Sequence, residues 1–263
     1  MQAIVDKWEA FLGKVSARFR EIMAEAEPGL DEIIATEVLD PAPVSGALSA
    51  VKARVYGLQK KIDESWASID AQLEGGALRN QLQERGRALS KQIEMELEVF
   101  LIHKAAQAAR ALKVLVDKEL GQVPRCSGCG VDLVPPVRHE ASTVTCAHCN
   151  AVNTLMPGMA TLMFYRGSAP HALAQEAALA EWKAQQQAEQ AFHDIREPGP
   201  ADLKRLEAAH VAYWRTYCQA FCQLHPGWGP AEVEREYTGR VGQFYYWARH
   251  SNHTLAKATW GPA

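Results

Sequence analysis

Several features that mark enzymes and membrane proteins are missing from this sequence of 263 residues. It contains no run of eighteen apolar residues, which excludes a membrane-spanning helix. It also contains no glycine-rich phosphate-binding loop, no nucleophile elbow and no His-Glu-x-x-His motif. With no catalytic motif present, we expect a non-enzymatic protein that works by binding other molecules.

A concentration of positive charge is missing as well. The formal net charge is −3, spread along the chain, and residues 121–170 carry three basic and two acidic side chains. The three basic residues are Arg125, Arg138 and Arg166. Binding to nucleic acid requires clustered Lys and Arg that displace counterions from phosphates. We therefore do not expect nucleic acid or a membrane surface among the partners.

Cysteine is scarce, but four of the six cysteines stand in two pairs, Cys126-Ser-Gly-Cys129 and Cys146-Ala-His-Cys149. Sixteen residues separate the pairs. This spacing is typical of one tetrahedral Zn²⁺ site, in which four thiolates leave no open position for water or substrate. We predict one structural zinc ion bound by Cys126, Cys129, Cys146 and Cys149.

The turns of such pairs favour residues that tolerate a positive φ. Gly128 and Gly130 provide this tolerance in the turn of the first pair, and Asn150 provides it in the turn of the second. His139 and His148 lie close by, but four cysteines already complete the site, so we expect both histidines to face solvent.

Paired cysteines can also form disulfides, redox dithiols or iron sites. The chain starts with Met1-Gln2-Ala3 and runs directly into an amphipathic helix without a signal peptide, which argues against disulfides and for a cytoplasmic protein. A thioredoxin-like dithiol would need a βαβ pattern, which is absent. Rubredoxin-type iron uses similar ligand pairs, so the spacing alone leaves iron open.

The stretch from about residue 122 to 160 resembles the zinc-ribbon superfamily. The resemblance rests on the four cysteines, on β-prone runs between and after them that are broken at Pro135-Pro136, and on Gly130, Leu133, Val144 and Pro157-Gly158. It implies a small β-sheet module closed on a four-cysteine zinc. It implies no single activity, because zinc ribbons bind nucleic acids, bind proteins or serve as structural elements.

The residues before this stretch predict helices. An apolar stripe marks a helix over 2–26, which we expect to end at Glu27-Pro28-Gly29. A short helix is expected over 30–39, before a break at Asp40-Pro41-Ala42-Pro43. From Val44 to Leu73, apolar residues recur in steps of four and three, which predicts a coiled-coil seam. Gly75-Gly76 then breaks the chain before a second long helix over 77–120, so residues 1–120 should form a helical bundle with an antiparallel hairpin.

The region 161–263 is predicted to be helical, with helices at about 170–193, 201–224 and 230–250. Eleven of the chain's twenty-one aromatic residues fall between Tyr213 and Trp260. This density favours a packed helical core, although it also suits a ligand pocket or an interface.

A second metal site is possible, because one helix face could carry Cys218, Cys222 and His225. His210 could then be a further ligand. The alternative is that both cysteines are buried as small apolar side chains and that the helix ends before Pro226.

We therefore predict a mainly α protein in three parts: a helical bundle over 1–120, a zinc ribbon over 121–160 and an aromatic-rich helical region over 161–263. The predicted function is that of a bacterial protein–protein interaction adaptor with an unidentified protein partner. The coiled-coil seam also allows the chain to form a homo-oligomer.

Two alternative functions remain. The first is a metalloenzyme or redox protein that uses the C-terminal cysteines and histidine.

The second alternative is a transcription regulator acting on RNA polymerase through the hairpin and the zinc module. A hairpin joined to a four-cysteine module looks like the DnaK-suppressor family of RNA polymerase regulators, whose acidic tip residues would be matched here by Asp70 and Glu74. The chain departs from that family in its greater length and in its ribbon-like cysteine pattern. Coiled-coil-plus-ribbon adaptors of secretion and motility systems have a similar architecture.

Overall fold

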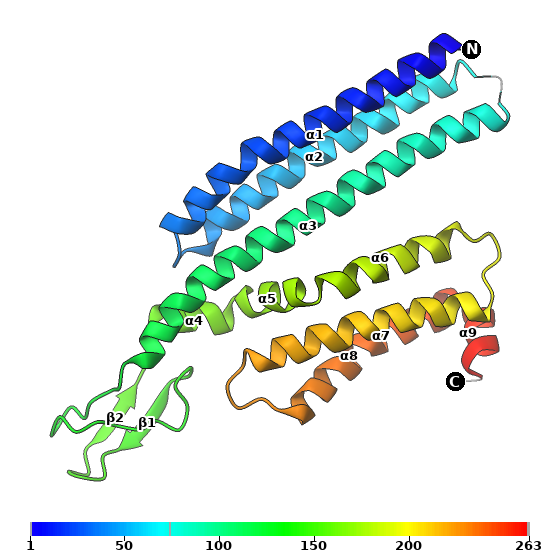
Figure 1. The fold of residues 1–263 in the computed structure, drawn as a ribbon. Helices are drawn as coiled ribbons and strands as arrows, with labels where there is room; N and C mark the ends of the chain where they lie inside the picture. Colours follow the sequence, from blue (N-terminus) through cyan, green and yellow to red (C-terminus); the bar gives the residue numbers. More distant parts are fainter. Residues whose placement is uncertain (1, 74, 262–263) are drawn as a thin grey trace. The chain divides into compact units, whose positions relative to one another are not determined.

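The computed structural model describes residues 2–73 and 75–261. This part of the chain is mainly α-helical, with one small antiparallel sheet, as the sequence predicts (Figure 1). The helices and strands follow in the order α1 (Gln2–Thr36), α2 (Pro41–Asp70), α3 (Ala77–Gly121), β1 (Ser142–Thr145), β2 (Val152–Leu155), α4 (Met159–Arg166), α5 (Ala169–Ala177), α6 (Leu179–Asp194), α7 (Pro200–Gln223), α8 (Pro230–Ser251) and α9 (His253–Trp260). None of the helices in these ranges has the length and apolar character needed to cross a bilayer.

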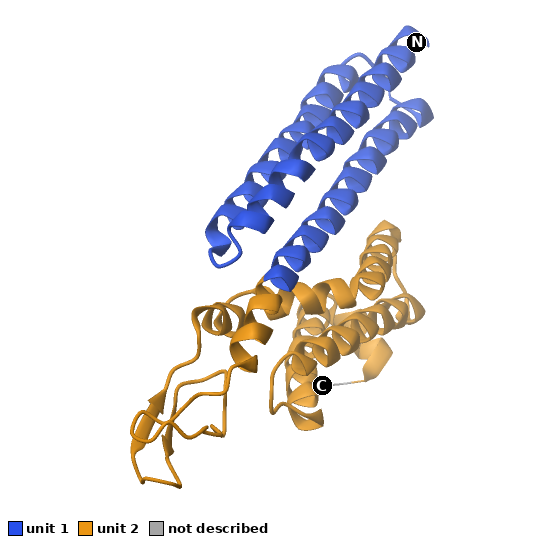
Figure 2. Ribbon diagram, turned by 60° about the vertical axis from the view of Figure 1, so that its left-hand side comes forward, with its two compact units in different colours: residues 1–111 blue, residues 112–263 orange. Residues whose placement is uncertain are grey.

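The chain divides into two units, Met1–Ala111 and Leu112–Ala263, coloured blue and orange in Figure 2. The first unit holds α1, α2 and most of α3. The second holds the end of α3, the two strands and the remaining helices. The finer division at residues 120 and 160 stays a prediction.

The first unit is a bundle of three helices that run alongside one another (Figures 1 and 2). Its core combines the predicted apolar stripe of α1 with the seam of α2 and with Leu82, Ile93 and Leu97 of α3. Trp8 is fully buried, and its indole N–H donates to the carbonyl of Leu82 at 2.9 Å. The seam residues of α2 therefore belong to a core shared by three helices, while a coiled coil as such stays a prediction.

The predicted helix end at Glu27-Pro28-Gly29 is wrong, because α1 continues through Pro28 to Thr36. A proline inside a helix removes a hydrogen bond and costs about 3 kcal/mol. The continuation buries Leu30 and Ile34. It also presents Asp31 to Lys104, which donates to the carboxylate at 2.7 Å. These tertiary contacts outweigh the local penalty.

The breaks on either side of α2 lie where the sequence predicts them. Asp40 caps α2 by accepting from the N–H of Ala42 at 2.9 Å, and Pro41 occupies the first turn, where its missing N–H costs nothing. Gly75 and Gly76 both have a φ of +91°, which reverses the chain before α3. Glu74, which the comparison with RNA polymerase regulators invokes, lies outside the described residues.

The ribbon segment of the second unit contains a two-stranded antiparallel sheet in which Ser142 pairs with Leu155 and Thr145 with Val152. The β-prone run at 131–134 makes only an isolated bridge, between Arg125 and Asp132. Leu133 is buried beside Cys126 and Cys146. The module is thus held by few backbone pairs and a very small apolar cluster.

The C-terminal helices differ from the prediction in three places. The expected helix at 170–193 is interrupted at Ala178, which separates α5 from α6. The short helices α4 and α9 were not predicted. The expected aromatic core is present as two clusters, one around Tyr213, Tyr217 and Phe221 and the other around Phe244.

Candidate metal centre

The two cysteine pairs form two turns with the same backbone hydrogen bonds. In the first, the N–H of Cys126 donates to Val131 at 2.8 Å and the N–H of Gly130 donates to Cys126 at 2.9 Å. In the second, Cys146 donates to Ala151 and Asn150 donates to Cys146, both at 2.9 Å. The sequence pattern Cys-x-x-Cys therefore folds locally into one geometry twice.

The residue after each pair has the positive φ that the sequence predicts, +75° at Gly130 and +56° at Asn150. The prediction for Gly128 is wrong, since its φ is not positive. Gly128 is small for a different reason: a Cβ there would lie 3.2 Å from the Cβ of Ala151 and 3.4 Å from the sulfur of Cys149. The first turn thus approaches the second so closely that a side chain at Gly128 would require a small shift of the second turn.

The four predicted ligands converge. The Sγ atoms of Cys126, Cys129, Cys146 and Cys149 all lie within 4.8 Å of one another. The sulfurs of Cys126 and Cys149 are 3.5 Å apart and those of Cys129 and Cys146 are 3.7 Å apart. Four sulfurs at about 2.3 Å from a tetrahedral ion would be about 3.8 Å apart. The cluster could therefore hold a metal ion with little movement.

The electrostatics of the cluster favour a cation. The backbone N–H groups of Cys129 and Gly128 point at the sulfur of Cys126 and lower the pKa of this thiol to about 6. At Cys149 the N–H of Ala151 acts in the same direction, but the neighbouring sulfurs of Cys129 and Cys126 outweigh it and raise the pKa to about 12. One thiolate forms readily, whereas the thiol of Cys149 keeps its proton because it can donate a hydrogen bond to the neighbouring sulfurs. A bound cation would take the place of that proton.

Asn153 is a functional residue that sequence reasoning missed. It lies on β2, is 5% exposed, and its Oδ1 accepts from the N–H of Ser127 at 2.8 Å and from its hydroxyl at 3.0 Å. Its Nδ2 donates to the sulfur of Cys126 at 3.6 Å and to the carbonyl of Ala151 at 3.0 Å. Asn153 thereby ties the first turn to the second and orients one ligand. An Asn inside a β-prone run is the signal that could have indicated this role.

Glu119, at the end of α3, fixes where the chain leaves the ribbon. Its carboxylate accepts from the N–H groups of Ala160 and Thr161 and from the Thr161 hydroxyl at 3.1, 2.9 and 2.8 Å. Burial acts to raise the pKa of Glu119, but these donors from the first turn of α4 outweigh it, so the pKa is lowered. A Cβ at Gly158 would collide with the carboxylate, so a side chain there would displace Glu119 from these donors.

The residues of the candidate second metal site do not converge on one point. Cys218 and Cys222 are buried in an aromatic cluster, and burial raises the pKa of both thiols, to about 11 for Cys218. The ring of His225 stacks on Trp228, and its Nδ1–H donates to the carbonyl of Phe221 at 3.0 Å. Within residues 2–73 and 75–261, the four ribbon cysteines are the only group of three or more His, Cys, Asp or Glu side chains close enough to hold an ion.

The remaining histidines have other surroundings. His210 lies 2.9 Å from a carboxylate oxygen of Glu189 and stacks on Phe244. His148 is exposed, as expected, whereas His139 is half-buried with its ring 5.1 Å from that of Tyr165.

No family model, curated protein or solved structure matches this chain. The resemblance to zinc ribbons therefore rests on the cysteine cluster and its two turns, which form a site consistent with a zinc ribbon.

Proposed function

We propose that this chain is a non-enzymatic interaction protein whose ribbon docks onto another protein, and that one Zn²⁺ ion bound by the four cysteines stabilises the ribbon. Zinc is the ion that best suits four thiolates at tetrahedral spacing, and such a closed site supplies structure rather than catalysis. The module has a very small core of its own, so metal binding would supply much of its folding free energy.

The observation that carries the docking proposal is the concentration of exposed apolar side chains on the ribbon. Of eleven large apolar side chains that are exposed in the described residues, six lie between residues 123 and 159. They are Val123, Val131, Val134, Val152, Met156 and Met159. Exposed apolar groups gathered in one region are typical of surfaces that bind other proteins.

Charge on the ribbon is low, which strengthens this proposal. Arg125 lies 3.5 Å from Asp132, and Glu119 is held by the first turn of α4. A surface with few charges and many aliphatic side chains suits the core of a protein interface better than a phosphate-binding surface.

The proposal can be tested by placing a photo-crosslinking amino acid at Val134 or Val152 in cells that produce the chain. We expect both positions to yield the same crosslinked protein, and the yield to fall at least tenfold when Cys126→Ser and Cys146→Ser abolish the metal site. Lys60 is the control position, because its side chain is 78% exposed and lies on α2.

Crosslinking from Lys60 alone, or no protein product from either ribbon position, would contradict docking through the ribbon. A product that is a subunit of RNA polymerase would support the transcription-regulator alternative over a general adaptor.

A further inference from the structure

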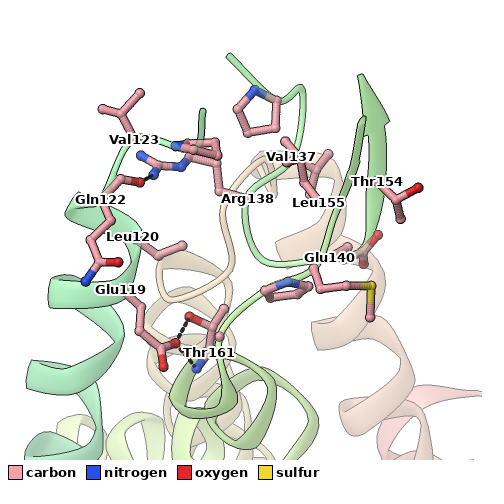
Figure 3. A pocket seen from close by; sticks show the side chains of 15 residues that line it. Glu119, Leu120, Gln122, Val123, Val137, Arg138, Glu140, Thr154, Leu155 and Thr161 are labelled. Carbon is pink, nitrogen blue, oxygen red and sulfur yellow. Dashed lines mark hydrogen bonds between the residues drawn. The ribbon is translucent and has the colours of Figure 1, made fainter. Parts of the chain in front are cut away.

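A groove of about 370 Å³ lies in the second unit, between the end of α3, the loop over 135–140 and the segment that follows β2. Its volume falls within the range of about 300–1,000 Å³ that is usual for ligand pockets. Figure 3 shows Val123 and Gln122 on one side of it and Leu155 and Thr154 on the other. Val123 is exposed at the rim, whereas Val137 and Leu155 are half-buried.

The charges that line the groove are one cation and one exposed carboxylate. Glu119 is already occupied by the N-terminal turn of α4. Arg138 donates to the backbone carbonyl of Gln122, and no carboxylate partner is found for it among the described residues. Glu140, two residues further along, is exposed and makes no ion pair with Arg138. A complementary occupant therefore carries both a negative and a positive group.

The backbone beside the groove favours an extended chain over a compact small molecule. The N–H of Cys146 donates to Ala151, and from this pair hydrogen-bonded and non-hydrogen-bonded pairs alternate along the antiparallel sheet. Thr154, opposite Thr143, falls at a non-hydrogen-bonded pair, so its N–H and C=O point away from β1. No other described segment forms backbone hydrogen bonds with these two groups. An extended peptide can pair with such an edge while its side chains enter a neighbouring pocket.

Resting on the proposed function, we propose that the groove binds an extended peptide segment of the partner protein. One aliphatic side chain of the segment occupies the groove between Val123 and Leu155. An acidic side chain on one flank faces Arg138, and a basic side chain on the other flank faces Glu140.

The probe is a displayed library of random linear peptides, selected on the zinc-loaded full-length chain. We expect the enriched peptides to share an aliphatic residue flanked by opposite charges. Binding of an enriched peptide should fall about tenfold or more for Val123→Asp, because a carboxylate at the rim must be desolvated beside the aliphatic side chain. Val114→Asp is the matched control, since Val114 is 68% exposed on α3, does not line the groove and is not one of the six exposed apolar residues of the ribbon, and it should bind as the wild type does.

The charge pairing has its own test. Arg138→Glu should weaken binding by roughly two- to fivefold, the range for exposed ion pairs, and replacing the acidic residue of the peptide by lysine should restore it. Enriched peptides that bind Val123→Asp as tightly as wild type would overturn the proposal, as would the absence of enriched peptides. Self-association of the chain that is lost in Val123→Asp would also overturn it, because a second copy would then occupy the groove.

The experiments distinguish a failure of the groove proposal from a failure of the proposal that the ribbon docks onto a protein. If the peptide experiments fail while Val134 and Val152 still crosslink to one protein, docking through the ribbon stands and the groove is not its site. If both fail, the ribbon has no docking role.

Discussion

Replacing Asn153 by alanine should weaken metal binding although no sulfur ligand is changed. The side chain makes four hydrogen bonds in the ribbon, two accepted from Ser127 and one donated to each of Cys126 and Ala151. Alanine removes all four. The first turn is then free to move away from the second, and the sulfur of Cys126 loses a donor that stabilises its charged form.

The expected loss of metal affinity follows from the effect of side chains that orient metal ligands. Loss of one such partner typically weakens metal binding 10- to 100-fold, which corresponds to about 1.4–2.7 kcal/mol. We expect Asn153→Ala to fall in this range. The stoichiometry should not change, because all four thiolates remain.

The assay is competition for Zn²⁺ between the protein and a chromophoric chelator. Thr154→Ala is the matched control, since Thr154 is the exposed next residue on β2 and no hydrogen bond joins its side chain to the ribbon turns. An affinity of Asn153→Ala equal to that of wild type and of Thr154→Ala would refute the reasoning.

Two further predictions concern stability. Gly86→Ala should destabilise the first unit by about 1–3 kcal/mol in urea unfolding, because the new Cβ would lie 2.7 Å from Cζ2 of Trp8. Gly57→Ala is the control: a Cβ there would have no heavy atom within 4 Å, so this substitution should stabilise the unit by up to about 1 kcal/mol. Equal effects of the two substitutions would contradict the packing described. The hydrogen bond with His210 lowers the pKa of Glu189 in the folded state. The stability that this hydrogen bond contributes is therefore present above the unfolded pKa of about 4.3 and is lost as pH falls through the lower folded pKa. The urea midpoint of wild type should therefore fall more steeply below about pH 4 than that of Glu189→Gln, and parallel curves would count against the pair.

The cysteine cluster was predictable because its determinants are local. Each Cys-x-x-Cys turn uses backbone hydrogen bonds within six residues, and positions such as Gly130 and Asn150 follow from the φ that the turn requires. The convergence of the two turns is what four thiolates sharing one ion would require.

The supporting residues were not predictable because they act across the chain. Asn153 contacts a turn that ends more than twenty residues earlier, and Glu119 contacts the first turn of α4 across the whole ribbon. Neither side chain belongs to a motif with a fixed spacing. Such partners become visible only when the strands and helices have been placed.

Helix ends show the same division between local and tertiary causes. The break at Asp40-Pro41 was predictable, because a cap and a first-turn proline are local signals. The continuation of α1 through Pro28 was not, because its cause is the burial of Leu30 and the contact of Asp31 with Lys104, which lies on another helix.

Metal content per chain, measured by elemental analysis, tests the central claim most directly. The account predicts one zinc in the wild type, one zinc in Cys218→Ser/Cys222→Ser and none in Cys126→Ser. Two metals or iron in the wild type, with one ion lost in the Cys218→Ser/Cys222→Ser variant, would contradict a single structural zinc and would place metal chemistry in the C-terminal helices.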